Sequence, residues 1–202
     1  KYLVNGNLKV LRHKGKSHGV KETRGKYSKG KSIRKRDKSV YSREEAGHWE
    51  ADTVVSGQGK SKACFATLAE RKTRFYIAMK MSDRRAETME NAIVAALSAF
   101  PPQLVKTITC DRGTEFANWR RIEERLHCEV YFADPYCAWQ KGTNENLNGL
   151  LREFYPKGRN LSRVAPATLK RNLALLNARP RKVLYFHSAQ ELWDFELNSC
   201  CT

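Results

Sequence analysis

The sequence predicts an α/β fold: a mixed five-stranded sheet flanked by helices and preceded by a flexible basic N-terminal arm. Three segments rich in β-branched and aromatic residues follow one another with short turns, and strands then alternate with helices in the order β-β-β-α-β-α-β-α. With 202 residues and 41% hydrophobic content, the chain is long enough for one domain with a substantial core. We expect the arm over residues 1–43 and the domain over residues 44–202.

The arm differs from the rest of the chain in charge. Residues 1–43 hold 15 of the 38 Lys and Arg but only two of the 21 acids, Glu22 and Asp37, so most of the net charge of +17 lies there. Its apolar residues are too few to form a core. Each phosphate that such an arm neutralises releases condensed counterions, so the expected partner is nucleic acid, with an anionic membrane surface as the second choice.

The first three strands are expected at residues 51–55, 63–69 and 75–81. A Gly-containing turn at 57–61 and a charged turn at 70–74 connect them. Turns this short join antiparallel neighbours, so an antiparallel meander is predicted.

Helices then enter the pattern. Apolar residues with a period near 3.6 predict a helix that Ser82 or Asp83 caps and the Pro101-Pro102 pair ends. A strand over 105–110, a short helix over 118–127 and a fifth strand over 129–133 follow. We expect the strand over 105–110 to deliver Asp111 at its carboxyl end.

A further helix is expected from about Asn144. Pro156 and Gly158 end it, and a last helix over about 166–178 and an amphipathic tail complete the chain. At 100° per residue, Glu145, Asn148 and Arg152 lie on the polar face, opposite an apolar stripe formed by Leu147, Leu150, Leu151 and Phe154.

Other classes of protein fit the composition poorly. No stretch reaches the roughly 18 apolar residues of a membrane span, and the start has no apolar signal core, so we expect a cytoplasmic protein that does not enter a membrane. The six cysteines include no Cys-x-x-Cys pair, and we expect reduced thiols that bind no metal. His13 and His18 are only a weak echo of a zinc finger, because no paired cysteines follow them. The absence of an initiating Met suggests a fragment or a processed chain.

Three acids in distinctive local sequences form a candidate site assembled from three elements. Asp52 lies in the first strand, Asp111 follows a strand, and Glu145 opens a helix, with 33 residues between the last two. Mg²⁺ prefers oxygen ligands, and two such cations neutralise the attacking and leaving oxygens of a phosphoryl transfer. Each acid also has an ordinary structural interpretation: Asp52 as an outward-facing or salt-bridged aspartate, Asp111 as a turn-forming residue, and Glu145 as a surface helix residue or a first-turn acid that complements the helix dipole. Spacing alone leaves these alternatives open.

Nearby acids are alternative ligands. Glu50 and Glu115 lie close to the triad in sequence, and either can replace one of the chosen ligands. Asp134 is a less favoured fourth acid, since Asp-Pro usually marks a turn.

Five stretches between Gly47 and Glu191 carry more information than the spacing. They are GHWEADTV (47–54), DRGTEF (111–116), DPY with WQKGTNEN (134–136 and 139–146), NGLLR (148–152) and NARPRK (177–182). Together they resemble the DDE transposases of bacterial insertion sequences, specifically the IS-thirty family with its retroviral-integrase-like catalytic core. Small departures are Ala138 where Pro is usual, Lys141 where Arg is common, and FHSA at 186–189 where Thr-Pro usually opens the terminal helix. The upstream helix-turn-helix with which such enzymes read their terminal repeats is not found among residues 1–202.

The resemblance implies a ribonuclease-H-like fold in which Asp52, Asp111 and Glu145 are the catalytic and metal-binding residues. They would hold two Mg²⁺ ions, for which Mn²⁺ would substitute. Water would first attack at the transposon end, and the freed 3′-hydroxyl would then attack target DNA without a covalent enzyme intermediate. A homo-oligomer on DNA, associated with the bacterial nucleoid, is also implied.

Residues around the triad are candidate DNA contacts. Trp139 suits stacking on a base or packing as an anchor, and Asn144 and Asn146 suit orienting the turn around Glu145 or contacting DNA. Solvated charge is the ordinary alternative for the candidate phosphate contacts Arg112, Lys141, Arg152, Lys157 and Arg159.

Two rival functions remain at this level. A hydrolytic nuclease of the same fold would carry the same acids and perform only the first step. A non-catalytic DNA-binding remnant of a transposase would depend on the basic arm for its affinity.

Overall fold

The strands form one mixed sheet in the order β1-β6-β5-β2-β3-β4. The computed structural model describes residues 30–200, and the first 29 residues of the predicted arm lie outside them. The strands are β1 (Lys31–Ser32), β2 (His48–Val55), β3 (Cys64–Glu70), β4 (Tyr76–Met81), β5 (Thr107–Cys110) and β6 (Glu129–Phe132). β2, β3 and β4 are antiparallel neighbours, whereas β5 runs parallel to β2 and β6. The five predicted strands are confirmed, and β1 adds a sixth at the edge.

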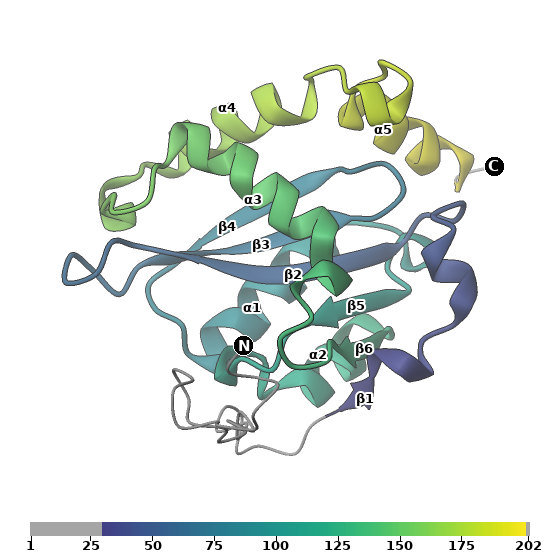
Figure 1. The fold of residues 1–202 in the computed structure, drawn as a ribbon, viewed down its shortest axis with the longest axis horizontal. Coiled ribbons are helices and arrows are strands. Elements are labelled where there is room, and N and C mark those ends of the chain that lie inside the picture. Colours follow the sequence, from purple (N-terminus) through teal and green to yellow (C-terminus); the bar gives the residue numbers. More distant parts are fainter. Residues whose placement is uncertain (1–29, 201–202) are drawn as a thin grey trace, which may run out of the picture.

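Helices cover both faces of the sheet (Figure 1). One core joins the sheet to α1 (Ala86–Leu97) and α2 (Trp119–Leu126), and the other joins it to α3 (Gly142–Phe154) and α4 (Pro166–Asn177). The α3 stripe behaves as its period predicts, since Leu147 and Leu151 are buried while Leu150 and Phe154 pack at the margin. α3 therefore lies on the sheet with its polar face free to form a site.

The C-terminal helix α5 (Ala189–Ser199) is joined to the α1 side of the sheet through aromatic packing. Trp193 is 1% exposed, lies 5.3 Å from the ring of Trp49 in an edge-to-face contact, and stacks on Phe75 at 5.1 Å. Ser188 and Glu191 form a capping box, so the FHSA sequence opens this helix without the usual Thr-Pro pair.

Helix α1 begins later than predicted. Its N-cap is Arg85, whose side chain makes no capping hydrogen bond. Asp83 instead accepts hydrogen bonds from the Arg85 N–H and the Thr88 hydroxyl, which forms a turn before the helix.

Residues 30–43, predicted as part of the basic arm, pack against the domain. β1 pairs with β6, and Ile33 and Val40 are 1% and 3% exposed. The Arg36 guanidinium donates to the Thr109 hydroxyl at 2.7 Å, beneath the end of β5. Scattered apolar residues thus suffice to attach a basic segment to an existing sheet edge, because the sheet supplies the rest of the core.

His48 is buried at the start of β2. Its Nδ1 lies 2.9 Å from the Thr107 hydroxyl and its Nε2 lies 3.1 Å from Glu45. Burial lowers the pKa of His48, Glu45 opposes this, and the positive charges of Lys106 and Arg36 add to the lowering.

Among the described residues, no helix is long and apolar enough to cross a bilayer.

Candidate active site

Asp52 and Asp111 lie at the same level of two neighbouring parallel strands. β2 and β5 pair in parallel with Glu50 beside Thr109, and each aspartate is two residues further along its strand direction. Neighbouring strands are about 4.8 Å apart. The topology therefore brings together two acids that are far apart in sequence. Asp111 follows the carboxyl end of its strand, as the sequence predicted.

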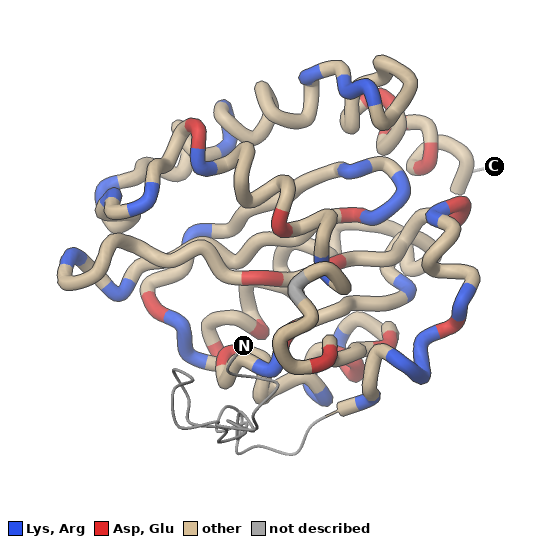
Figure 2. Tube along the Cα trace, viewed as in Figure 1, with Lys and Arg blue, Asp and Glu red and all other residues tan. Residues whose placement is uncertain are grey.

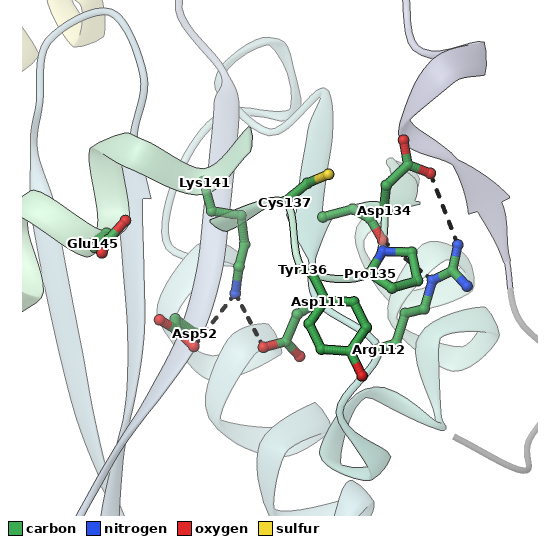
Figure 3. Close-up of a pocket in the computed structure, with 10 residues that line it drawn as sticks. Asp52, Asp111, Arg112, Asp134, Pro135, Tyr136, Cys137, Lys141 and Glu145 are labelled. Atoms are coloured by element: carbon green, nitrogen blue, oxygen red, sulfur yellow. Dashed lines mark hydrogen bonds and ion pairs between the residues drawn. The ribbon is translucent and has the colours of Figure 1, made fainter. Parts of the chain in front are cut away.

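A cation lies between these two carboxylates. The Lys141 Nζ is 3.3 Å from Asp52 Oδ1 and 3.4 Å from Asp111 Oδ2, and it also donates to the Ala51 carbonyl at 3.2 Å. Figure 3 shows the ammonium group between the two acids. Burial by itself lowers the pKa of Lys141, but the attraction of Asp52 and Asp111 outweighs it and the pKa is raised. The ammonium group thus stands in for a cation held by the two aspartates.

Glu145 lines the same pocket from the first turn of α3. The pocket has a volume of about 360 Å³, and its lining includes all three acids of the predicted triad together with Lys141 and Arg112. The Glu145 side chain is exposed and stands apart from the aspartate pair (Figure 3). Within residues 30–200, no three acidic, His or Cys side chains are grouped closely enough to hold one metal ion. The pocket therefore collects the three acids without drawing them onto one point.

The remaining carboxylate oxygens are held by short hydrogen bonds. Asn148 donates its amide to Asp52 Oδ2 at 3.0 Å, and the Tyr76 hydroxyl donates to Asn148 at 2.7 Å. Asp111 Oδ1 accepts the Gly113 N–H at 2.8 Å. The other oxygen of each carboxylate, Asp52 Oδ1 or Asp111 Oδ2, faces the cation, and Asp52 Oδ1 also accepts the Thr53 N–H at 2.9 Å.

A buried network sets the position of α3 along β2. The Asn144 N–H donates to Glu50 Oε2 at 2.8 Å, and its amide donates to the Glu50 carbonyl at 2.6 Å and the Thr67 carbonyl at 3.2 Å. Asn148 lies four residues after Asn144 on the helix, a rise of about 6.0 Å, and Asp52 lies two residues after Glu50 on the strand, a rise of about 6.6 Å. Because these two lengths are nearly equal, Asn144 meets Glu50 and Asn148 meets Asp52 at the same time.

The alternative acids have other partners. Glu50 is fully buried and ion-paired to Arg71 at 2.7 Å, so it supports α3 and does not line the pocket. Glu115 is 3% exposed, accepts a hydrogen bond from Thr53 at 3.1 Å and pairs with Arg84 at 2.7 Å.

Asp134 does line the pocket, but it is engaged by basic residues. Arg34 lies 3.0 Å from Asp134 Oδ2, and Arg112 lies 3.9 Å from Oδ1. The hydrogen bond from Arg34, followed by that from Gln140, lowers the pKa of the Asp134 carboxyl.

The candidate DNA contacts fall into two groups. Lys141 and Asn144 are 8% and 0% exposed and have internal partners, so in this structure both support the site from within and neither offers an exposed side chain to DNA. Trp139 lies in sequence between the pocket-lining residues Cys137 and Lys141 and is 71% exposed, so it is not a packing anchor. The other candidate DNA contacts have side chains that are exposed or partly exposed to solvent: Arg112, Asn146, Arg152, Lys157 and Arg159.

Basic residues recur in two segments of the chain. Figure 2 shows Lys and Arg recurring along the segment from β1 to β2 and in the loop between α3 and α4. At the acidic pocket itself, Arg112 is part of the lining and Arg34 pairs with the lining residue Asp134, and positive charge beside acids favours a polyanion whose reacting group approaches them.

Two residues acquire roles that sequence reasoning missed. Asn148 orients Asp52, and its position three residues after Glu145, on the same helical face, was the available signal. Lys141 joins the two aspartates, which no spacing rule indicates, because the contact depends on how the 3-10 turn Ala138–Lys141 approaches the sheet.

Comparison with known proteins agrees with this geometry. The integrase core domain family matches residues 42–138. The chain is 37% identical over 165 residues to a probable transposase for the insertion-like sequence element IS1161 of Streptococcus salivarius, covering 82% of this chain and 46% of that protein. It is 36% identical over 184 residues to the transposase InsI for insertion sequence element IS30A of Escherichia coli (strain K12), covering 90% and 47%. The chain thus spans about half the length of these relatives.

Solved structures share the fold at low sequence identity. The catalytic core domain of BIV integrase aligns with a TM-score of 0.58 and 16% identity over 78% of this chain and 99% of that one. The HTLV-2 integrase catalytic core domain, solved in complex with magnesium in a trimeric form, aligns with a TM-score of 0.55 and 14% identity over 73% and 95%. The sheet therefore has the ribonuclease-H-like fold of integrase cores, residues 42–138 belong to the integrase core domain family, and the chain is similar to IS-thirty insertion-sequence transposases.

Proposed function

We propose that this chain is the catalytic part of an insertion-sequence transposase, a polynucleotidyl transferase that cuts DNA at the element's ends and joins them to target DNA. The observation that carries the proposal is the cation position: Asp52 and Asp111 hold an ammonium group between them, and Glu145 lines the same pocket. The similarity to named transposases over most of this chain supports it.

Divalent metal is the proposed cofactor. Asp52, Asp111 and Glu145 would hold Mg²⁺, as two ions, with Mn²⁺ as a substitute. The donor set fits, because all three side chains offer carboxylate oxygens and two of them already face one cation. Bound metal would supply Lewis-acid stabilisation of the attacking and leaving oxygens of the phosphodiester.

The chain's own residues would prepare the site for this chemistry. Asn148 and the Gly113 N–H hold one oxygen of each aspartate in place. Lys141 neutralises the pair while no metal is bound, and its release would open both carboxylates to ligands. Water is the first nucleophile in this scheme and the freed 3′-hydroxyl the second, so no side chain becomes covalently attached to DNA.

DNA would lie across the pocket and the basic surface beside it. In this proposal exposed Trp139 would stack on a base, and the accessible side chains of Arg112, Arg152, Lys157, Arg159 and Asn146 would contact the backbone. The basic residues 1–43 would add sequence-independent affinity. Joining two ends to one target needs two active sites, so a homo-oligomer on DNA, at the bacterial nucleoid, completes the proposal.

Strand transfer tests the proposal directly. A labelled, pre-cut DNA end and a supercoiled target plasmid are incubated with the chain in Mg²⁺ or Mn²⁺. We expect joined products that Asp52→Asn, Asp111→Asn and Glu145→Gln each abolish. Glu124→Gln, at an exposed acid on α2, is the matched control and keeps activity.

The other outcomes separate the rival functions. Metal-dependent nicking without joining, lost in the three variants, would identify a nuclease. DNA binding with no metal-dependent chemistry, equal in wild type and variants, would identify a DNA-binding remnant and overturn the proposal.

A further inference from the structure

A second pocket lies on the other side of the first turn of α3, and three arginines line it. Its volume is about 260 Å³, and its lining includes Arg43, Arg74 and Arg181 together with Thr143 and Asn146. No acidic residue is part of the lining. We call this the arginine pocket.

The three guanidinium groups have few internal partners. Arg74 donates one bond to the Thr143 hydroxyl at 2.8 Å, and Arg181 donates one to the Leu176 carbonyl at 2.9 Å. The Nε atoms of Arg74 and Arg181 are buried without a hydrogen-bond partner. For Arg43, no hydrogen bond or ion pair is found among residues 30–200. Donors left open in this number are unusual, because buried polar groups normally find partners.

The surrounding charge makes the arrangement unfavourable without an anion. Burial lowers the pKa of Arg43, and the neighbouring charge of Arg71 adds to this. Burial also lowers the pKa of Arg181, and Arg179 adds to it. Glu50, the acid whose charge favours the charged form of Arg43, is already paired with Arg71. Desolvated like charges with open donors require a negative partner.

Two of the three arginines have an uncommon backbone conformation. Arg43 and Arg74 both have a positive φ of 62°, a conformation that side chains with a Cβ rarely adopt. Four separate segments contribute to the pocket: the residues before β2, the β3–β4 turn, the first turn of α3 and the loop after α4. Strained residues persist where the surrounding structure holds them, and they gather at binding sites.

We propose that the arginine pocket binds one phosphate group of the DNA strand whose reacting phosphodiester occupies the acidic pocket. This deepens the proposed function and rests on it. Guanidinium forks match phosphate oxygens, and Thr143 and Asn146 add neutral polar groups. Glu145 lines the acidic pocket and the adjacent residue Asn146 lines the arginine pocket, so one strand crossing the start of α3 reaches both.

The test is DNA affinity measured without metal, so that it does not depend on chemistry. Fluorescence anisotropy of a labelled duplex in EDTA, over a series of salt concentrations, gives the slope of log Kd against log salt. Each lost phosphate contact lowers the slope by about 0.9 and, at about 0.15 M salt, weakens binding roughly fivefold. We expect this change for Arg74→Gln and for Arg181→Gln.

The double variant tests whether the arginines share one phosphate. Sharing predicts that Arg74→Gln with Arg181→Gln loses little more than either single variant. The control is Arg171→Gln, an exposed arginine on α4 with the same charge change, which should leave the slope unchanged. Arg43→Gln breaks no internal hydrogen bond within the described residues, so it keeps the test valid if the other variants fail to fold.

The outcomes are distinguishable from failure of the proposed function. Wild-type slopes in the pocket variants, or losses that add in the double variant, would overturn the inference even if strand transfer occurs. A shared, non-additive loss would support it even if no strand transfer is seen. A free anion is the other possible ligand of the arginine pocket, and inorganic phosphate tests it. If phosphate raises the Tm of wild type but not of Arg43→Gln, while the pocket variants keep the wild-type salt slope of DNA binding, the pocket binds a free anion and the DNA assignment is overturned.

Discussion

Asn144 and Asn146 lie two residues apart on the first turn of α3, and replacing each by Ala should affect stability very differently. Asn144 is 0% exposed, and its side chain takes part in three hydrogen bonds, with the Glu50 carbonyl, the Thr67 carbonyl and the Thr67 hydroxyl. Asn146 is exposed. We expect Asn144→Ala to destabilise the protein strongly and Asn146→Ala to leave its stability nearly unchanged.

The magnitude follows from the hydrogen bonds. At about 1 kcal/mol of net stability each, three bonds amount to about 3 kcal/mol. For a domain of this size that corresponds to a fall in Tm of about 6–12 °C. The exposed substitution should stay within about 0.5 kcal/mol.

Urea unfolding followed by far-UV circular dichroism measures both variants against wild type. Asn144→Asp is an informative third variant, because it keeps the side-chain shape but places a second carboxylate beside buried Glu50, and its loss should exceed that of Asn144→Ala. If Asn144→Ala and Asn146→Ala differ by less than about 1 kcal/mol, the buried network does not hold α3 in place.

Three further changes test the site and its surroundings. Gly113→Ala should lower strand transfer by about tenfold or more, because its Cβ would lie 2.3 Å from Glu115 Oε2 beside the catalytic pocket. Its control is Gly149→Ala, whose Cβ meets nothing within 4 Å and which should raise the free energy of unfolding by about 1 kcal/mol. Lys141→Met should lower the Tm in EDTA by roughly 2–4 °C, since two partly exposed ion pairs sum to about 1 kcal/mol, and should enlarge the rise in Tm that Mg²⁺ produces. His48→Gln should flatten the loss of stability as the pH falls through 6.5, because a lowered folded-state pKa means that the unfolded chain binds more protons below that pH.

Each of these has a contrary result. Equal strand transfer by Gly113→Ala and Gly149→Ala would show that the turn after Asp111 has room for a side chain. A Lys141→Met variant whose Tm in EDTA matches wild type would mean that the ammonium group contributes nothing to the aspartate pair; Lys157→Met, at an exposed lysine, is its control. For the histidine, the free energy of unfolding of wild type relative to the variant should fall from about pH 7 to about pH 5, and a constant difference would contradict the assigned pKa direction.

Local patterns along the chain determined the elements of the fold and the acids of the site. Period-2 and period-3.6 patterns place the five long strands and the helices, because burial of one face dictates where apolar residues recur. The strand end before Asp111 and the helix start before Glu145 were predictable for the same reason. Residues 30–43 were not, since a few apolar side chains acquire a core only when an existing sheet edge supplies the other half.

Tertiary structure alone decided what each polar side chain does. Asn144 and Asn146 are the same residue type in the same turn, yet one is buried against β2 and the other faces the arginine pocket. The sequence predicts Lys141 as a solvated or phosphate-contacting cation, whereas in the structure its ammonium group lies between two carboxylates. The physical reason is that hydrogen bonds and charge pairs act over a few ångströms, and which groups come that close depends on strand register and helix placement, which no local pattern in the sequence specifies.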